Sequence, residues 1–261
     1  MDFGIAGKVA LVLGASGGLG GGSARALAAE GVRVVCAGRD LTKLDQTVAA
    51  IRASGGEASA VQLDLSDLSQ IEPVVSQIER SVGSIDILVN ISGGPTPSVV
   101  QGQPLDTWRA QFEAMVLSII ALTDRVLPGM RQNGWGRIIT NTSTGPITPI
   151  SNLGLSNTLR SSLHGWSKSL SNQVGVDGVT CNVVVPGRIA TARVEKVDAD
   201  AAERQGVPVV EVEAKSAALI PVGRYGTSDE YGAVVAFLAS QQASYVTGSI
   251  IRVDGGMVPS V

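Results

Sequence analysis

Short apolar runs alternate along the chain with longer segments whose apolar residues recur at helical spacing. Runs of strand length lie at 9–13, 32–37, 58–63, 85–90, 136–141, 179–185 and 249–253. Segments with helical periodicity lie at 19–30, 41–53, 67–82, 105–131, 152–174 and 228–239. This alternation is typical of repeated βαβ units and predicts an α/β fold. We expect a single doubly wound Rossmann-type domain, with a mostly parallel seven-stranded sheet and helices on both faces.

The domain organisation follows from the same pattern. Neither a linker-like stretch nor an internal repeat divides residues 1–261, so they are expected to form one domain. Because parallel connections are right-handed, two βαβαβ halves leave a ligand crevice at the carboxyl ends of the strands. Segment 193–225 is charged, rich in alanine and interrupted by Gly206, Pro208 and Pro221. We interpret it as an irregular insertion after a strand end and as a candidate substrate lid.

Composition narrows the function classes. Hydrophobic residues make up 44% of the 261 residues but aromatic residues only 3%, so Ala, Val, Ile and Leu must form the core, as in a sheet buried on both faces. The net charge of -3 offers no basic surface to a nucleic acid, which favours a small-molecule substrate. Without a signal-peptide pattern or an apolar run of roughly 18 residues, a cytoplasmic location and no membrane segment are expected.

The cysteines and the lone histidine do not indicate a metal site. Cys36 and Cys181 each lie within a Val-rich, strand-like run, where a buried reduced thiol is favoured over a ligand, a nucleophile or a disulfide. His164 lies within a predicted helix, where a packed or interface histidine is favoured over a general base. We therefore expect no metal.

A glycine-rich turn directly follows the first predicted strand and precedes a helix-forming segment. It consists of Gly14-Ala15-Ser16-Gly17-Gly18-Leu19-Gly20. The glycines at 14, 18 and 20 permit a tight turn, close approach of the backbone to a pyrophosphate and close packing of helix on strand. The helix N-terminus adds oriented N–H donors. We therefore expect this turn to bind a dinucleotide, rather than to be merely flexible.

The spacing Gly14-x3-Gly18-x-Gly20 resembles that of short-chain dehydrogenases/reductases, and the similarity extends to the C-terminus. It is nearest to 3-oxoacyl-carrier-protein reductase-like members. Further segments that resemble family motifs are Asn90-Ile91-Ser92-Gly93, Pro186-Gly187-Arg188-Ile189-Ala190-Thr191 and 245–256. The resemblance implies that Asn90, Ser92, Gly93, Pro186, Gly187, Ile189 and Thr191 contact the dinucleotide, with the loop 186–191 at the nicotinamide carboxamide. It also implies a homotetramer, with a homodimer as the minimum.

Cofactor preference can be read at the end of the second predicted strand. Gly38 stands at the position where NAD-using members of the family carry Asp, and Arg39 follows it. An arginine fork suits a 2′-phosphate, so NADP(H) is preferred, although Arg39 followed by Asp40 could also be a solvated surface cation. Asp64, with Leu65 after it, matches the family's adenine contact; the alternative is an ordinary helix cap near Ser66.

The catalytic centre departs from the family. The family's tetrad is Asn, Ser, Tyr and Lys, and the resemblance places Met115, Ser143, Ser156 and Arg160 at these positions. Only Ser143 is retained. In the family the Lys cation lowers the pKa of the Tyr phenol, so that the phenol exchanges a proton with the substrate oxygen.

The replacements cannot perform this chemistry in the same way. Ser156 is a far weaker acid than a phenol, and Arg160 stays protonated. Arg160 could still bind the nicotinamide ribose or an anionic substrate group. Ser143 is interpreted as a substrate contact, with the bonding of a loop amide as the alternative, and Ser156 either acts in catalysis or leaves room for substrate. Tyr225 is the one tyrosine considered as a replacement acid.

These residues are compatible with three candidate functions. The favoured one is an atypical NADP(H)-dependent oxidoreductase that transfers a hydride to or from a small carbonyl, imine or alcohol. A dehalogenase- or lyase-like enzyme shares the fold and the Arg, but such enzymes retain the Tyr and lack the dinucleotide turn. The third is a non-catalytic NADP(H)-binding protein. Substrate, reaction direction and proton donor are not determined by the sequence.

Overall fold

The structure is a computed structural model that describes residues 2–260, and its centre is a sheet of seven strands. The strands are β1 (Val9–Leu13), β2 (Arg33–Gly38), β3 (Ala58–Gln62), β4 (Ile87–Asn90), β5 (Gly136–Asn141), β6 (Val179–Pro186) and β7 (Ile250–Val253). They are arranged in the order β3-β2-β1-β4-β5-β6-β7, and every pair is parallel. The predicted fold class is confirmed, with a sheet that is entirely parallel rather than mostly so.

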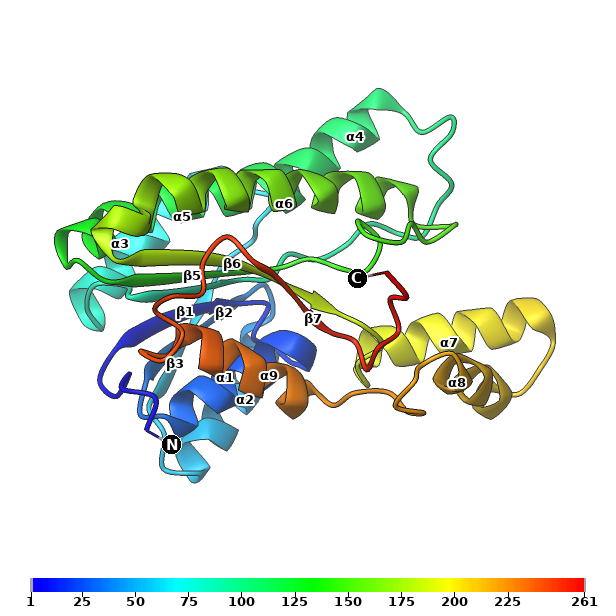
Figure 1. Cartoon of the computed structure of the whole chain (residues 1–261), viewed down its shortest axis with the longest axis horizontal. Coiled ribbons are helices and arrows are strands. Elements are labelled where there is room, and N and C mark those ends of the chain that lie inside the picture. The colour runs from blue at the N-terminus through cyan, green and yellow to red at the C-terminus, as the bar shows by residue number, and fades with distance from the viewer. Residues whose placement is uncertain (1, 261) are drawn as a thin grey trace.

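Helices cover both faces of the sheet, as Figure 1 shows. The helices are α1 (Gly18–Ala29), α2 (Leu41–Ala53), α3 (Ile71–Ser81), α4 (Leu105–Phe112), α5 (Ser118–Gln132), α6 (Gly154–Val174), α7 (Ala192–Gln205), α8 (Val209–Ala218) and α9 (Ser228–Ala239). Short 3-10 turns lie at η1 (Leu68–Gln70) and η3 (Gly175–Asp177), and a π-helical turn lies at η2 (Glu113–Leu117). The chain changes its winding direction between β1 and β4, which places the crevice there.

Two apolar clusters, one on each face of the sheet, form the core. One cluster joins the sheet to α3, α5 and α6, and the other joins it to α1, α2 and α9. Aliphatic side chains dominate both clusters, in accordance with the low aromatic content. Cys36 and Cys181 are buried free thiols within them, as predicted, and burial raises the pKa of each to about 12.

Close backbone packing holds the first helix in place. A Cβ on Gly22 of α1 would lie 2.1 Å from the carbonyl oxygen of Ser228, and one on Gly232 of α9 would lie 2.4 Å from that of Gly22. Any side chain at either position would collide with backbone, so both glycines are required for α9 to pack directly on α1. This contact fixes the helix whose N-terminus follows the glycine turn.

Two predicted segments differ from the structure. The helix predicted at 105–131 is divided by the π-helical turn η2, which contains the buried Met115. A π-turn inserts one residue into a helix, and the apolar periodicity of this segment does not reveal it.

The segment 193–225 is not irregular, because it contains α8 and almost all of α7. Thr191 caps the start of α7, Gly206 ends it in a left-handed conformation with φ 66°, and Pro208 precedes α8. These residues are helix boundaries rather than interruptions. Figure 1 shows α7 and α8 side by side at one end of the molecule, beyond the sheet. Within residues 2–260 no helix is both long and apolar enough to cross a membrane.

Candidate active site

The glycine turn has the backbone geometry that a phosphate cradle requires. Gly14 and Gly18 are left-handed, with φ 62° and 52°, and a Cβ on Gly20 would lie 2.3 Å from the carbonyl oxygen of Gly14. Gly17 is the N-cap residue of α1 and has no side chain that could accept a hydrogen bond from the helix. The first N–H groups of α1 are therefore not covered by a side-chain cap. Ser16 and Leu19 are half-buried within the turn. These residues lie together at the carboxyl end of β1.

The loop after β6 closes over the same turn from the second half of the chain. A Cβ on Gly18 would lie 3.3 Å from the Cγ2 atom of Thr191. Gly187 approaches the β7 end so closely that a Cβ there would lie 2.6 Å from the Cα of Asp254. Ile189 is buried and forms a parallel bridge with Gly226. The loop that begins at Pro186 is therefore held rigidly against the crevice.

Arg39 lies exposed at the carboxyl end of β2. Its neighbour Asp40 is engaged elsewhere, because its carboxylate accepts from the Lys43 amide at 3.2 Å as the cap of α2. The Asp40 carboxylate also lies 3.8 Å from the Lys43 ammonium. A Cβ on Gly38 would make only ordinary contacts, the nearest 3.6 Å from Leu44. Arg39 is therefore an exposed cation at the carboxyl end of β2, and its charge is not paired with Asp40.

Asp64 follows β3 and is bonded within its own turn. Its carboxylate accepts from the Ser66 amide at 3.0 Å and from the Ser66 hydroxyl at 2.8 Å. These two hydrogen bonds hold the pKa of Asp64 below its usual value, and the charge of Arg39 contributes less. The helix cap expected as the alternative is supplied instead by Asp67, which precedes η1, and Asp64 makes only a local turn with Ser66. Leu65 packs half-buried against the core.

Polar atoms at the end of β4 remain without partners. The Asn90 side chain is fully buried and donates its amide to Thr123 Oγ1 at 3.2 Å, while its Oδ1 has no partner among the described residues. Ser92 Oγ is likewise buried and unpaired within residues 2–260. A buried unsatisfied polar atom costs about 1 to 3 kcal/mol, so such atoms call for a ligand or ordered water. Around Gly93 a Cβ would meet no atom within 4 Å. With the glycine cradle, this crevice fits a dinucleotide.

Arg160 links α6 to the ends of two strands. Its Nη2 donates to the carbonyl oxygens of Gly93 at 2.8 Å and Ser92 at 3.1 Å, and its Nη1 donates to that of Asn141 at 3.4 Å. The side chain is buried, and burial, with a smaller contribution from the nearby charge of Arg193, lowers the pKa of Arg160 to about 10. It therefore remains a cation at neutral pH. It cannot exchange a proton as a lysine does.

The two serines have different surroundings. Ser143 Oγ accepts from the Gly145 amide at 3.2 Å, which is the loop-amide arrangement, but its O–H is still able to donate to a substrate. Ser156 is buried in the first turn of α6, one turn before Arg160. His164 does not serve as a base for either serine, because its Nε2 is bonded to Thr142 Oγ1 at 3.0 Å and burial lowers its pKa. The packed role predicted for His164 is confirmed.

Tyr225 is a poor replacement acid. Its hydroxyl donates to Asp198 Oδ2 at 2.8 Å and accepts from Arg188 Nη1 at 3.1 Å. Asp198 is fully buried and paired with Arg188 at 2.6 Å. Burial is the main cause that raises the pKa of Tyr225. Its proton is already committed to a buried carboxylate, so Tyr225 has a structural role between α7 and the loop before α9.

Two residues near the site were not singled out from the sequence. Tyr231 of α9 is fully buried, and its hydroxyl donates to Asn141 Oδ1 at 2.9 Å, which supports the strand end that receives Arg160. Arg193 of α7 approaches Gly94, close to Arg160. A motif pattern could not identify either residue, because each reaches the site through a contact between distant segments.

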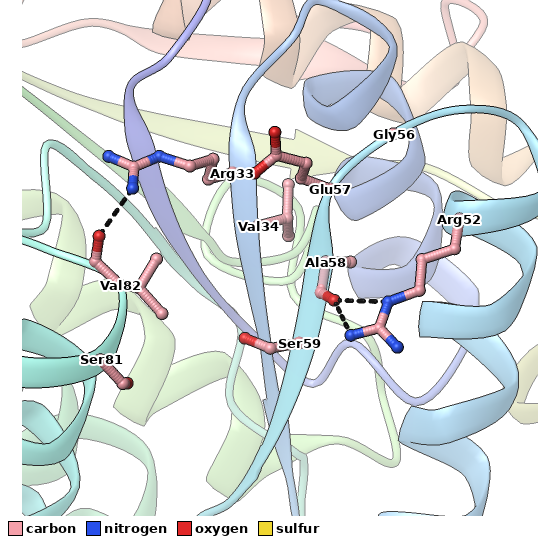
Figure 2. Close-up of a pocket in the computed structure, with 9 residues that line it drawn as sticks. All are labelled: Arg33, Val34, Arg52, Gly56, Glu57, Ala58, Ser59, Ser81 and Val82. Atoms are coloured by element: carbon pink, nitrogen blue, oxygen red, sulfur yellow. Dashed lines mark hydrogen bonds between the residues drawn. The ribbon is translucent and has the colours of Figure 1, made fainter.

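Other features of the molecule lie away from this crevice. A surface cavity of about 420 Å³ lies at the amino ends of β2 and β3. Figure 2 shows the residues that line it. Its two guanidinium groups are satisfied by carbonyl oxygens: Arg33 donates to Val82 at 2.7 Å, and Arg52 donates to Ala58 at 3.0 and 2.7 Å. Ligands of doubly wound folds bind at the opposite ends of the strands. Residues 2–260 contain no cluster of three or more metal-ligating side chains.

Known proteins are similar to this chain in sequence and in fold over nearly its whole length. Residues 14–258 match the family model described as enoyl-(acyl carrier protein) reductase. The chain is 34% identical to the 3-oxoacyl-[acyl-carrier-protein] reductase FabG of Salmonella typhimurium over 253 residues, 96% of this chain and 97% of the relative. It is 31% identical to the NADPH-dependent reductase BacG of Bacillus subtilis over 256 residues, 97% and 99% of the two chains.

A solved structure shows the same architecture. The L-sorbose reductase from Gluconobacter frateurii, complexed with NADPH and L-sorbose, superposes with a TM-score of 0.95 at 29% identity and covers 100% of both chains. Sequence and fold therefore agree along the length of the molecule. The chain belongs to the short-chain dehydrogenase/reductase family.

Proposed function

We propose that this protein is an NADP(H)-dependent oxidoreductase that transfers a hydride to or from a small carbonyl, imine or alcohol without a tyrosine acid. The observation that carries the proposal is the pair of buried, unpaired atoms Asn90 Oδ1 and Ser92 Oγ beside the glycine cradle. Arg39 supports the choice of NADP(H), as do the relatives that bind or use NADPH. The membership of the family supports an oxidoreductase.

Each group of residues then has a role in binding. The glycine turn and the first N–H groups of α1 hold the pyrophosphate, and Arg39 pairs with the 2′-phosphate. Asn90, Ser92 and Gly93, with Pro186, Gly187, Ile189 and Thr191, orient the nicotinamide end. Asp64 and Leu65 border the adenine. The bound dinucleotide supplies the hydride chemistry, and the chain supplies position and electrostatics.

The catalytic residues are Ser143, Ser156 and Arg160. With a carbonyl or quinone, the Ser143 hydroxyl donates to the substrate oxygen and the buried Arg160 cation stabilises the negative charge that develops there when hydride is delivered. A charged imine needs neither contribution, because hydride delivery neutralises it. Ser156 leaves room where the family carries a phenol. Because no strong general acid stands here, the favoured substrates need little proton donation, such as a charged imine, an activated quinone or a polarised carbonyl.

The segment 193–225 is proposed as the substrate lid. A cavity of about 470 Å³ lies between α7 and α8, with Ala190, Val194, Val210, Ala214, Ala217 and Tyr225 among its lining residues. It adjoins the loop that contacts the glycine turn. This pair of helices is therefore placed to cover a substrate above the strand ends.

Single-turnover oxidation of NADPH tests the function directly. The protein is mixed with saturating NADPH and a panel of imines, quinones and simple ketones, and NADPH absorbance is followed in a stopped-flow instrument. We expect measurable turnover of at least one imine or quinone and very slow turnover of simple ketones. Tight NADPH binding without hydride transfer to any member of the panel would instead identify a non-catalytic binding protein.

A further inference from the structure

We propose that Arg160 and Arg193 together form a binding site for an oxyanion of the substrate, a carboxylate or a phosphate group. This inference rests on the proposed function, since it names the class of substrate for that site. It begins from Gly94, directly after the segment that borders the crevice. A Cβ on Gly94 would lie 2.9 Å from Arg193 Nη2 and 3.7 Å from Arg160 Nη2. Two guanidinium groups thus converge on one point of the backbone.

Neither cation of this pair is neutralised. The salt bridges between described residues include neither Arg160 nor Arg193. Arginine is almost never buried without a partner, yet Arg160 is 6% exposed and bonded only to neutral carbonyl oxygens. Like charges at short range repel, and low exposure strengthens this repulsion. An anion between the two groups removes that penalty.

The hydrogen-bonding capacity of the pair is adequate for such an anion. A guanidinium has five N–H donors, and Arg160 donates both Nη2 hydrogens and one Nη1 hydrogen to carbonyl oxygens, which leaves the second Nη1 hydrogen and the Nε hydrogen for an anion. Arg193, the second residue of α7, is exposed, and within residues 2–260 no carboxylate is paired with its guanidinium. The planar fork of Arg193 can bind two oxygens of a carboxylate or phosphate in a bidentate manner, and Arg160 adds its positive charge and its free N–H groups. Arg160 provides the buried half of the site and Arg193 the exposed half.

The location favours the substrate as the source of the anion. The pyrophosphate cradle lies after β1 at the start of α1, and Arg39 lies after β2. Arg160 is instead fixed to the ends of β4 and β5, on the same helix as Ser156. Arg193 is the second residue of α7, the first helix of the lid. A substrate between the strand ends and the lid therefore meets both cations.

Calorimetric titration with non-reducible anions tests the site. Malonate and inorganic phosphate are titrated, at low ionic strength, into the free protein and into the protein saturated with NADP+. We expect at least one of the two anions to bind in both conditions, and the preferred probe shows whether a carboxylate or a phosphate is recognised. Arg193→Ala should weaken this binding about tenfold, since a charged hydrogen bond contributes about 1.5 to 3 kcal/mol and Arg193 is partly solvated.

A second variant retains both charges. Gly94→Ala adds a methyl group 2.9 Å from Arg193 Nη2, which is closer than an ordinary contact, so it should displace that long side chain and weaken anion binding in the same direction. Arg204→Ala removes an exposed arginine from the last turn of the same helix and should change nothing.

The outcomes separate this proposal from the proposed function. If neither anion binds, or if Arg193→Ala and Arg204→Ala bind as the parent does, the oxyanion site is refuted. If neither anion binds to the NADP+-saturated protein, the anions bound to the free protein occupied the dinucleotide site, and the proposal is also refuted. Loss of NADPH binding with anion binding intact would refute the proposed function alone.

Discussion

The Cγ2 atom of Thr191 lies 3.3 Å from the place that a Cβ on Gly18 would occupy. These residues are far apart in the chain, yet they bring the turn after β1 against the loop after β6. Gly18 is also left-handed, with φ 52°, a conformation that costs an L-residue roughly 1 to 2 kcal/mol. Glycine at position 18 therefore permits the left-handed backbone and leaves space between the turn after β1 and the loop after β6.

Replacement of Gly18 should consequently impair cofactor binding. In Gly18→Ala, the added methyl group meets Thr191 and strains the turn, so we expect NADPH affinity to fall roughly tenfold or more, with a loss of stability of about 1 to 2 kcal/mol. Calorimetry and urea unfolding measure the two effects. Gly165→Ala is the matched control, because Gly165 lies exposed in α6 and a Cβ there meets nothing within 4 Å. An unchanged NADPH affinity in Gly18→Ala would contradict the cradle.

Cofactor choice should depend on the end of β2. NADPH is expected to bind more tightly than NADH, and Arg39→Ala should reduce NADPH affinity by about 1.5 to 3 kcal/mol while leaving NADH affinity unchanged. Gly38→Asp should shift the preference toward NADH, since a Cβ at this position makes only ordinary contacts and a carboxylate repels a 2′-phosphate. Equal affinities of the parent for both cofactors would remove the basis for NADP(H).

Restoration of the family's acid should raise activity on simple ketones. Missing general-acid catalysis costs roughly 10²- to 10⁴-fold, so Ser156→Tyr combined with Arg160→Lys should recover part of that factor in single-turnover NADPH oxidation. Either substitution alone should do little, because the phenol and the ammonium act as a unit. A parent that is already fast on simple ketones would show that another group supplies the proton. Tyr225→Phe should not change the rate, because that hydroxyl is bonded to Asp198.

The buried thiols should make the fold sensitive to alkali. The pKa values of Cys36 and Cys181 are raised by burial to about 12, above the ordinary value of 9.0. Their protonated forms thus stabilise the folded state below about pH 9, and this stabilisation is lost as the pH rises toward the folded pKa. Urea unfolding at neutral pH and at about pH 10 should show a larger loss of stability for the parent than for a Cys36→Ser/Cys181→Ser variant. Rapid labelling of native thiols by Ellman's reagent would contradict their burial.

A homotetramer is expected in solution, assembled through the helices that include α4, α5 and α6. Leu105 and Phe112 of α4 are 69% and 39% exposed, which is unfavourable for apolar side chains unless a partner covers them. Leu105→Glu and Phe112→Glu should therefore shift sedimentation toward smaller species. Leu41→Glu, at an exposed site on α2, should not. A monomeric parent at micromolar concentration would refute the assembly.

Much of the fold could be predicted because it depends on local patterns. Strand-length apolar runs placed all seven strands within two residues of their observed bounds, as for β2 at Arg33–Gly38 against 32–37. The continuity predicted for the helix at 105–131 and the irregular structure predicted for 193–225 were wrong for a common reason. A π-turn depends on how helix backbone packs, and a cap such as Thr191 is recognisable only when its helix is already known.

The residues of the candidate site could likewise be predicted only in part from the sequence. The glycine turn was located by its spacing, and Arg39 and the Ser156 and Arg160 replacements were located by the resemblance to the family, because motif positions are properties of the chain. Only the tertiary structure shows that Arg160 donates to the carbonyl oxygens of Ser92, Gly93 and Asn141. It also shows that the Tyr225 hydroxyl donates to Asp198 and that Arg193 lies beside Gly94. These contacts join segments far apart in the chain, and their existence depends on side-chain packing and burial, which no local pattern encodes.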